Sequence, residues 1–157
     1  MKKNNKGFSL VELIVVVLIM AIIATALTLA VTKYVAKSKR SADANTAGEL
    51  KTAAETAVTD YLTTKGIIVS TSATANGTIT INSNTMTATG NSCDSGFVDA
   101  DFQAIFQEAA GTAAQMSKVH PGEHFVVTIT VKPGDIASYN VAYSTHSTED
   151  IFENGTK

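Results

Sequence analysis

Residues 6–32 read KGFSLVELIVVVLIMAIIATALTLAVT, and the interpretation of the chain rests on this segment. A lysine, a glycine and a phenylalanine open it, and Glu12 follows after three further residues. From Leu13 to Thr32 there are 20 residues without a charge. As an α-helix they rise about 30 Å, which matches the hydrocarbon core of a bilayer. The segment therefore predicts a membrane-spanning helix close to the N-terminus.

Three classes of N-terminal segment combine a basic start with an apolar run. A cleaved secretory signal peptide has an apolar stretch of roughly 7–15 residues and a small-residue cleavage site. Lys2, Lys3 and Lys6 supply the basic start, and residues 24–30 have the composition of a cleavage region, but the apolar run is long and begins beside Glu12. An ordinary signal anchor explains the run, but neither Glu12 nor the residues before it.

The third class accounts for the whole segment. Residues 6–13, KGFSLVEL, closely resemble the leader junction of type IV pilins and the related pseudopilins. In that family a membrane aspartic protease, the prepilin peptidase, cleaves after the glycine and methylates the new N-terminus. The resemblance implies a class III leader that ends at Gly7 and a mature chain that begins at N-methylated Phe8. It also implies that Glu12 is the family's acidic residue of filament assembly.

Glu12 places an ionisable carboxyl group at the start of the predicted membrane-spanning segment. An ionisable side chain in a transmembrane segment is costly and marks a functional site, and a carboxylate in hydrocarbon needs a cation. After cleavage, the nearest cation in the chain is the new α-amine of Phe8. About one helical turn separates the two residues, so the pair closes either within one subunit or between neighbouring subunits. The resemblance favours the second, which sets the axial register of a helical homopolymer. The alternative places Glu12 at headgroup level beside Lys6.

The helix is expected to continue beyond the membrane. Apolar residues recur at spacings of three and four and mark one helical face, and Lys65-Gly66 is a plausible end. One helix is therefore predicted from about Phe8 to Thr64, hydrophobic all round at first and amphipathic later. The residues of the predicted face are Ala47, Leu50, Ala54, Ala57, Val58, Tyr61 and Leu62.

The remaining residues predict a small antiparallel sheet and a second helix. Residues 67–96 are rich in Thr, Ser, Asn and Gly and indicate a polar surface loop. The expected elements are short strands at 67–69 and 78–81, a turn at 82–84, a helix over 100–117 ended by His120-Pro121-Gly122, strands at 125–132 and 136–143 joined by Pro133-Gly134, and a third strand or extended tail near Ile151-Phe152.

Together these elements predict an α+β chain in which a long N-terminal α-helix, its first half membrane-spanning, packs on a small C-terminal antiparallel β-sheet head. This arrangement is similar to the pilin fold. The expected parts are a cleaved leader over residues 1–7, a transmembrane or filament-core helix over 8–32, and a globular pilin head over 33–157 that includes the amphipathic half of the helix.

The sequence departs from the family at one point in the apolar run. Many pilins carry a proline there, but no proline precedes Pro121, and Leu29 lies near the expected position. A proline weakens a helix locally, so its absence argues against a melted stretch. Thr25, Thr28 and Thr32 are expected to bond back to the helix and bend it only slightly.

Charge is distributed unevenly along the chain. Lys33, Lys37, Lys39 and Arg40 follow the apolar run, and residues 41–157 carry five lysines against thirteen acidic residues. An acidic head argues against nucleic-acid binding and suits a domain displayed outside the cell. Positive charge on both sides leaves the positive-inside rule undecided, so the cytoplasmic side of the leader is taken from the cleavage motif. The basic group at 33–40 would then face outward, near anionic headgroups.

No catalytic arrangement is evident. His120 and His124 flank a turn with Glu123, which would allow a weak metal site, and His146 is the third histidine; surface histidines beside a turn are the preferred interpretation. Asp94, Asp99 and Asp101 fit no calcium-loop pattern, and capping of the second helix explains Asp99 or Asp101 better. Cys93 is the only cysteine, either a buried apolar side chain or a thiol that pairs between subunits. We predict no enzymatic activity, no metal and no cofactor.

The resemblance implies a major or minor pilin of a type IV pilus that serves adhesion, motility or colonisation. The alternative is a pseudopilin of a type II secretion or DNA-uptake machine. The expected partners are further copies of the chain, the prepilin peptidase, the inner-membrane assembly platform with its ATPase, and the membrane before assembly. The expected location is the cell membrane, as a single-pass protein, and then an extracellular filament.

Overall fold

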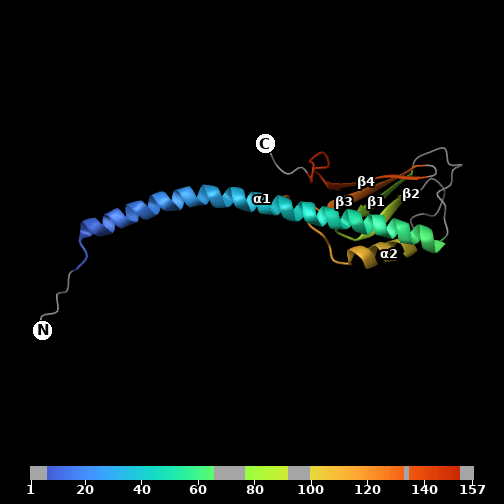
Figure 1. Cartoon of the computed structure of the whole chain (residues 1–157), viewed down its shortest axis with the longest axis horizontal. Helices are drawn as coiled ribbons and strands as arrows, with labels where there is room; N and C mark the ends of the chain where they lie inside the picture. The colour runs from blue at the N-terminus through green and yellow to red at the C-terminus, as the bar shows by residue number, and fades with distance from the viewer. Residues whose placement is uncertain (1–6, 66–76, 92–99, 133–134, 153–157) are drawn as a thin grey trace, which may run out of the picture. The chain divides into compact units, whose positions relative to one another are not determined.

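The computed structural model describes residues 7–65, 77–91, 100–132 and 135–152. The chain divides into two compact units, Met1–Ser38 and Lys39–Lys157, and the first helix contributes to both. The predicted α+β class is confirmed. Figure 1 shows the elements, which are α1 (Leu10–Lys65), β1 (Gly77–Asn82), β2 (Thr87–Asn91), α2 (Ala100–Ala110), β3 (Phe125–Lys132) and β4 (Asp135–Tyr143).

The long helix α1 forms as predicted. It begins at Leu10 rather than at about Phe8, and it ends at Lys65, where the Lys65-Gly66 pair predicted an end. Its second half buries the predicted face, and Ala53 joins this face while Leu62 is only partly buried. The buried members are Ala47, Leu50, Ala54, Ala57, Val58 and Tyr61.

The sheet has the strand order β2-β1-β3-β4, and every neighbouring pair is antiparallel. β3 has the predicted bounds, and β4 begins one residue before the predicted strand. Because side chains alternate along a strand, every second residue faces the same side. Ile81 pairs with Val127, which pairs with Val141, and all three side chains are buried.

The buried face of the sheet, α1 and α2 share one core. Phe102 and Phe106 of α2 are fully buried, and the ring of Phe102 meets Tyr61 of α1 edge-on, with ring centroids 5.6 Å apart. On the sheet side, Phe125 of β3 and Tyr143 of β4 lie opposite each other with ring centroids 5.7 Å apart. The apolar stripe of α1 is therefore covered by the sheet and α2, as an amphipathic helix requires.

Helix α2 is shorter than predicted. The sequence predicted a helix over 100–117, but α2 ends at Ala110. Gly111 follows with a φ of 81°, and glycine in this left-handed conformation commonly ends a helix. Ala113 and Met116, which lie at helical spacing within the predicted range, are exposed. Their spacing of three residues was helical only by coincidence.

Strand β2 lies in the segment that was predicted to be a polar loop, and this part of the prediction was wrong. β2 pairs with β1 along its length, with Ile81 opposite Ala88. Among the described side chains of β2, Ala88 alone lies in the core, so the segment lacks the apolar alternation that identifies a strand in sequence. The predicted turn at 82–84 is present, where the Asn82 side chain accepts the backbone N–H of Asn84 at 2.9 Å.

Three smaller predictions have different outcomes. The expected strand at 67–69 and the expected turn at Pro133-Gly134 lie outside the described residues. No strand forms near Ile151-Phe152, where the chain makes a bend. Ile151 is nevertheless buried in the core, so the last described residues pack against the sheet and helices without pairing.

Asp43 of α1 is a fully buried carboxylate. It accepts hydrogen bonds from the Ser117 hydroxyl at 2.6 Å, from the backbone N–H groups of Lys118 and Val119 at 2.6 and 3.1 Å, and from the Tyr143 phenol at 3.2 Å. Hydrogen bonds to an ionised group are strong and offset the cost of its burial. Asp43 therefore joins α1 to the segment after α2 and to the end of β4.

Burial and the contact with Asp43 both change the pKa of the Tyr143 phenol. Burial, and then the charge and hydrogen bond of Asp43, raise the pKa of the Tyr143 phenol well above its usual range. In the unfolded chain the same phenol ionises near pH 10. Its contribution to stability is therefore fully present below about pH 10 and is lost as the pH rises toward the folded-state pKa.

Two glycine substitutions should change stability in opposite directions. An added Cβ at Gly90, whose φ is 139°, would lie 2.1 Å from the carbonyl oxygen of Thr78, so Gly90→Ala forces β1 and β2 apart. Gly48→Ala meets nothing within 4 Å in α1 and should stabilise by about 1 kcal/mol through helix propensity. Urea unfolding in mild detergent, followed by circular dichroism, measures both midpoints. An unchanged midpoint for Gly90→Ala would contradict the β1–β2 register.

Tyr143→Phe should alter how stability depends on alkaline pH. At pH 8 the variant should be about 1 kcal/mol less stable, because it loses a hydrogen bond to Asp43. Above about pH 10 the difference should shrink, since only the wild-type chain then gains free energy by ionising this phenol when it unfolds. Urea midpoints at pH 8, 9, 10 and 11 test this. A constant difference across the series would contradict the raised pKa.

Candidate functional site

The predicted cleavage junction lies just outside α1. Gly7, Phe8 and Ser9 form no regular structure, and the Phe8 side chain is 82% exposed. An added Cβ at Gly7 would meet nothing within 4 Å. The described part of the chain therefore leaves the Gly7–Phe8 bond accessible and gives no packing reason for a glycine. Any requirement for glycine here would come from whatever binds the junction.

Glu12 lies in the first turn of α1. The Ser9 carbonyl accepts the backbone N–H of Leu13 at 3.2 Å, so Ser9 is the residue that caps the helix. Ser9 and Glu12 then have the spacing of a capping box, in which a serine and a glutamate three residues later satisfy the free N–H groups of the first turn. A negative charge there also interacts favourably with the helix dipole. The spacing alone would give Glu12 a local capping role that glutamine could share, besides its predicted role in assembly.

The apolar stem, residues 8–32, exposes its hydrophobic surface. α1 is long and apolar enough over this part to cross a membrane, and none of the most apolar window is buried. Exposed side chains include Leu10 at 75% and Ile22 at 69%, and apolar side chains on every side of the helix are exposed to a similar degree. In water such a surface would be unfavourable at about 25 cal/mol per Å². The stem therefore needs an apolar environment, which is consistent with a membrane-anchored precursor.

The stem is a continuous helix across Leu29, where many pilins have proline. The predicted back-bonds are present, because the hydroxyls of Thr25, Thr28 and Thr32 donate to the carbonyls of residues 22, 24 and 29 at 2.8, 2.8 and 3.1 Å. These threonines consequently present methyl groups and satisfied hydroxyls to their surroundings. The helix has no break in this part.

The other charged candidates are placed as follows. Lys33, Lys37, Lys39 and Arg40 are all exposed on α1. Asp101 is exposed in the first turn of α2. The predictions for Cys93, Asp94 and Asp99 fall outside the described residues.

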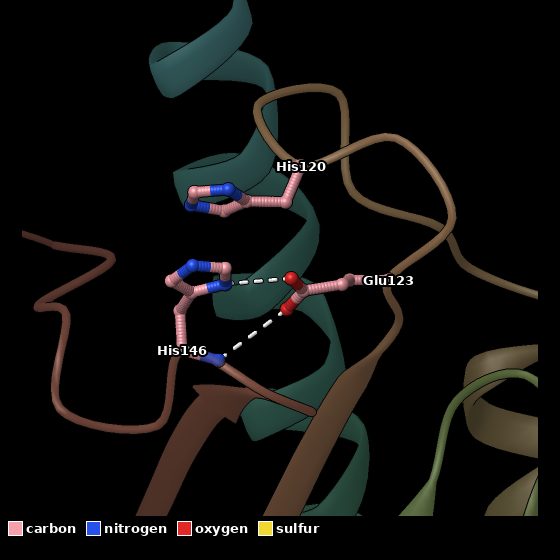
Figure 2. A group of neighbouring side chains, drawn as sticks. All are labelled: His120, Glu123 and His146. Carbon is pink, nitrogen blue, oxygen red and sulfur yellow. Dashed lines mark hydrogen bonds and ion pairs between the residues drawn. The ribbon is translucent and has the colours of Figure 1, made fainter.

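The histidines do not group as the sequence suggested. The turn prediction placed His124 with His120 and Glu123, but the structure brings His146 to these two residues instead (Figure 2). His124 precedes β3 and pairs as an isolated bridge with Met116. The signal that sequence reasoning missed is a repeated pattern, His-x-x-Glu, which occurs at 120–123 and again at 146–149.

Glu123 is ionised more readily than an ordinary glutamate. Partial burial opposes ionisation, but a hydrogen bond to the His146 ring and backbone hydrogen bonds from Thr145 and His146 outweigh it. The pKa of Glu123 therefore lies below its usual range. The contribution of this carboxylate to stability is present above about pH 4.3, the ordinary glutamate value, and is lost as the pH falls through the lowered pKa.

Comparison with known proteins gives one match. Residues 2–28 match the family described as the prokaryotic N-terminal methylation motif. The match covers the basic start, the Gly7–Phe8 junction, Glu12 and most of the apolar stem. No curated protein and no solved structure matches the chain.

Proposed function

Because residues 2–28 match the prokaryotic N-terminal methylation motif, we propose that the chain is a type IV pilin-like precursor with a class III leader and that it becomes a structural subunit of a type IV pilus. The prepilin peptidase cleaves it after Gly7 and methylates the amine of Phe8, and the mature subunit then leaves the membrane to join a filament. Pilin-like proteins are structural rather than catalytic, so we assign the chain no enzymatic activity.

One observation carries this proposal. A fully exposed apolar helix begins directly after the accessible Gly7–Phe8 junction, and an acidic residue, Glu12, lies in its first turn. A simple anchor needs the apolar surface alone. An acid at this position is unfavourable in a membrane unless a cation meets it. Cleavage supplies that cation, as the new amine of Phe8.

In the assembled state, Glu12 of an incoming subunit pairs with the Phe8 amine of its neighbour. The amine exists only after cleavage, so uncleaved precursor cannot form the pair and stays in the membrane. In the filament, copies of the apolar stem replace lipid around one another. Small residues along the stem, Ala21, Ala24, Ala26 and Ala30, permit close approach of helices, as in membrane helix packing.

The partners follow from this sequence of events. They are further copies of the chain, the prepilin peptidase, and an inner-membrane assembly platform driven by its ATPase. The subunit is a single-pass membrane protein before assembly and lies in an extracellular filament afterwards. Exposed Lys33, Lys37, Lys39 and Arg40 lie where they would contact anionic headgroups before assembly.

Gly7→Val should block processing. An added Cβ at Gly7 meets nothing within 4 Å in the described chain, and Gly7 lies outside α1, so we expect a defect to arise at the protease and not from misfolding. Processing should fall at least about tenfold, equivalent to 1.4 kcal/mol of lost binding to the protease. Intact-mass measurement of the membrane fraction shows either the full precursor or a chain beginning at methylated Phe8. Asn5→Val, within the leader, is the control, and wild-type cleavage of Gly7→Val would contradict the assigned junction.

Substitutions at Glu12 test the function itself. Filaments sheared from cells and imaged with an antibody to this chain should contain the wild-type protein. Glu12→Ala and Glu12→Gln should both be cleaved after Gly7, yet both should enter filaments at least about 100-fold less, because loss of one partner of a buried ion pair costs about 3–5 kcal/mol.

The glutamine variant separates the two roles of Glu12. Glutamine preserves the capping box but not the charge. If Glu12→Gln assembles normally and Glu12→Ala does not, Glu12 acts by capping the helix, and the ion pair is wrong. If both assemble normally, neither role holds. Absence of the wild-type chain from extracellular fibres, with loss of secretion or DNA uptake on deletion, would identify a pseudopilin instead.

A further inference from the structure

Two copies of one short turn lie at the same end of the β3–β4 hairpin. Residues 120–123 read HPGE and precede β3, and residues 146–149 read HSTE and follow β4. In each copy the backbone N–H of the glutamate donates to the carbonyl of the histidine, at 3.0 Å in the first turn and 3.1 Å in the second. Because Phe125 lies opposite Tyr143, the antiparallel pairing brings the two turns together.

The side chains of the two turns pair crosswise. His146 Nδ1 lies 2.6 Å from Glu123 Oε1, and His120 Nε2 lies 2.8 Å from Glu149 Oε2. The two imidazole rings stack between these pairs, with centroids 4.2 Å apart and planes 9° apart. Figure 2 shows the stacked rings and the Glu123 carboxylate beside them. Each histidine therefore faces the carboxylate of the opposite turn.

The backbone and neighbouring side chains hold this cluster in place. Glu123 Oε2 accepts the backbone N–H groups of Thr145 and His146 at 3.2 and 3.4 Å. The His120 backbone N–H donates to the Ser117 hydroxyl at 2.8 Å, and the His120 ring meets Tyr143 edge-on at 4.8 Å. Such supporting contacts are what orients metal ligands in proteins.

We propose that His120, Glu123 and His146 bind a divalent transition-metal ion of the Zn²⁺ class, with Glu149 beside them as a fourth oxygen ligand. One ligand atom from each of the first three residues lies within 4.8 Å of the others. Two imidazoles and a carboxylate are a characteristic Zn²⁺ ligand set, and imidazole favours Zn²⁺, Cu²⁺ and Ni²⁺ over Mg²⁺ and Ca²⁺. The ion replaces the proton that each ring shares with its carboxylate.

The cluster is accessible and can close around an ion. The side chains of His120 and Glu149 are 22% and 38% exposed, and those of His146 and Glu123 are 53% and 15% exposed. Tetrahedral Zn²⁺ with bonds of about 2.1 Å separates its ligand atoms by about 3.4 Å. The two histidine–carboxylate pairs, now 2.6 and 2.8 Å apart, must therefore separate by somewhat less than about 1 Å, whereas ligand atoms up to 4.8 Å apart must approach by as much as about 1.4 Å. The exposed His146 and Glu149 side chains have room to rotate.

A bound metal ion would link the turn before β3 to the segment after β4. A ligand that binds only the folded state stabilises it in proportion to the logarithm of its concentration over its dissociation constant. The ion would tie the last described residues, including the buried Ile151, to the sheet more firmly than the two ion pairs alone.

The test uses the full chain in mild detergent, stripped of metal and without a polyhistidine tag. Zn²⁺ at about 100 times its dissociation constant should raise the midpoint of thermal unfolding by at least about 5 °C, and Ca²⁺ should not. Co²⁺ should give the visible absorption of a tetrahedral or five-coordinate site with imidazole ligands. No shift with Zn²⁺, or an equal shift with Ca²⁺, would overturn the proposal.

Matched variants locate the ion. His146→Ala, at an exposed position, should weaken Zn²⁺ binding at least tenfold, while His124→Ala, the third histidine and outside the cluster, should leave it unchanged. Unfolding of each variant in EDTA checks that the fold persists. If His146→Ala does not fold, Glu149→Gln replaces it and should alter the Co²⁺ spectrum. Equal loss of binding in His124→Ala, or none in the cluster variants, would contradict the site.

Discussion

The buried carboxylate of Asp43 is the contact on which the arrangement of the second unit, Lys39–Lys157, depends. A charge removed from water costs several kcal/mol unless hydrogen bonds replace its hydration. The donors to Asp43 come from the segment after α2, at Ser117 to Val119, and from Tyr143 at the end of β4. If either segment moved away from α1, the buried Asp43 carboxylate would lose hydrogen bonds that replace its hydration. The same contact extends to His120, through the Ser117 hydroxyl and the Tyr143 ring.

Elements with a strong apolar period could be predicted from sequence, whereas this contact could not. The apolar stripe from Ala47 to Leu62 predicts which face of a helix is buried, and the alternation of residues 125–132 predicts which face of a strand is buried. Both elements formed as expected. Asp43, in contrast, looked like one of many acidic residues that keep the domain soluble. An aspartate within a helix is usually solvated, and only the position of Ser117 in three dimensions reveals that this one is not.

The incorrect predictions share one cause. In each case the structure depends on a contact with a residue that is distant in sequence. Of the described side chains of β2, only Ala88 lies in the core, and the strand is defined by its pairing with β1. At the candidate sites, Gly7, Phe8 and Glu12 were assigned by a resemblance of eight residues. The structure adds only that the junction is accessible and that Ser9 caps the helix. The partner of His120 and Glu123 was missed because His146 is separated from them by a whole hairpin.

The unbroken stem has a mechanical consequence. A helix rises about 1.5 Å per residue, whereas an extended chain spans about 3.4 Å, so a melted stretch can lengthen under tension and a hydrogen-bonded one cannot until its bonds break. The helix of this chain runs without interruption past Leu29, with the hydroxyls of Thr25, Thr28 and Thr32 bonded to it. A fibre of such subunits would be stiff along its stems, and any elasticity would come from slippage between neighbouring helices.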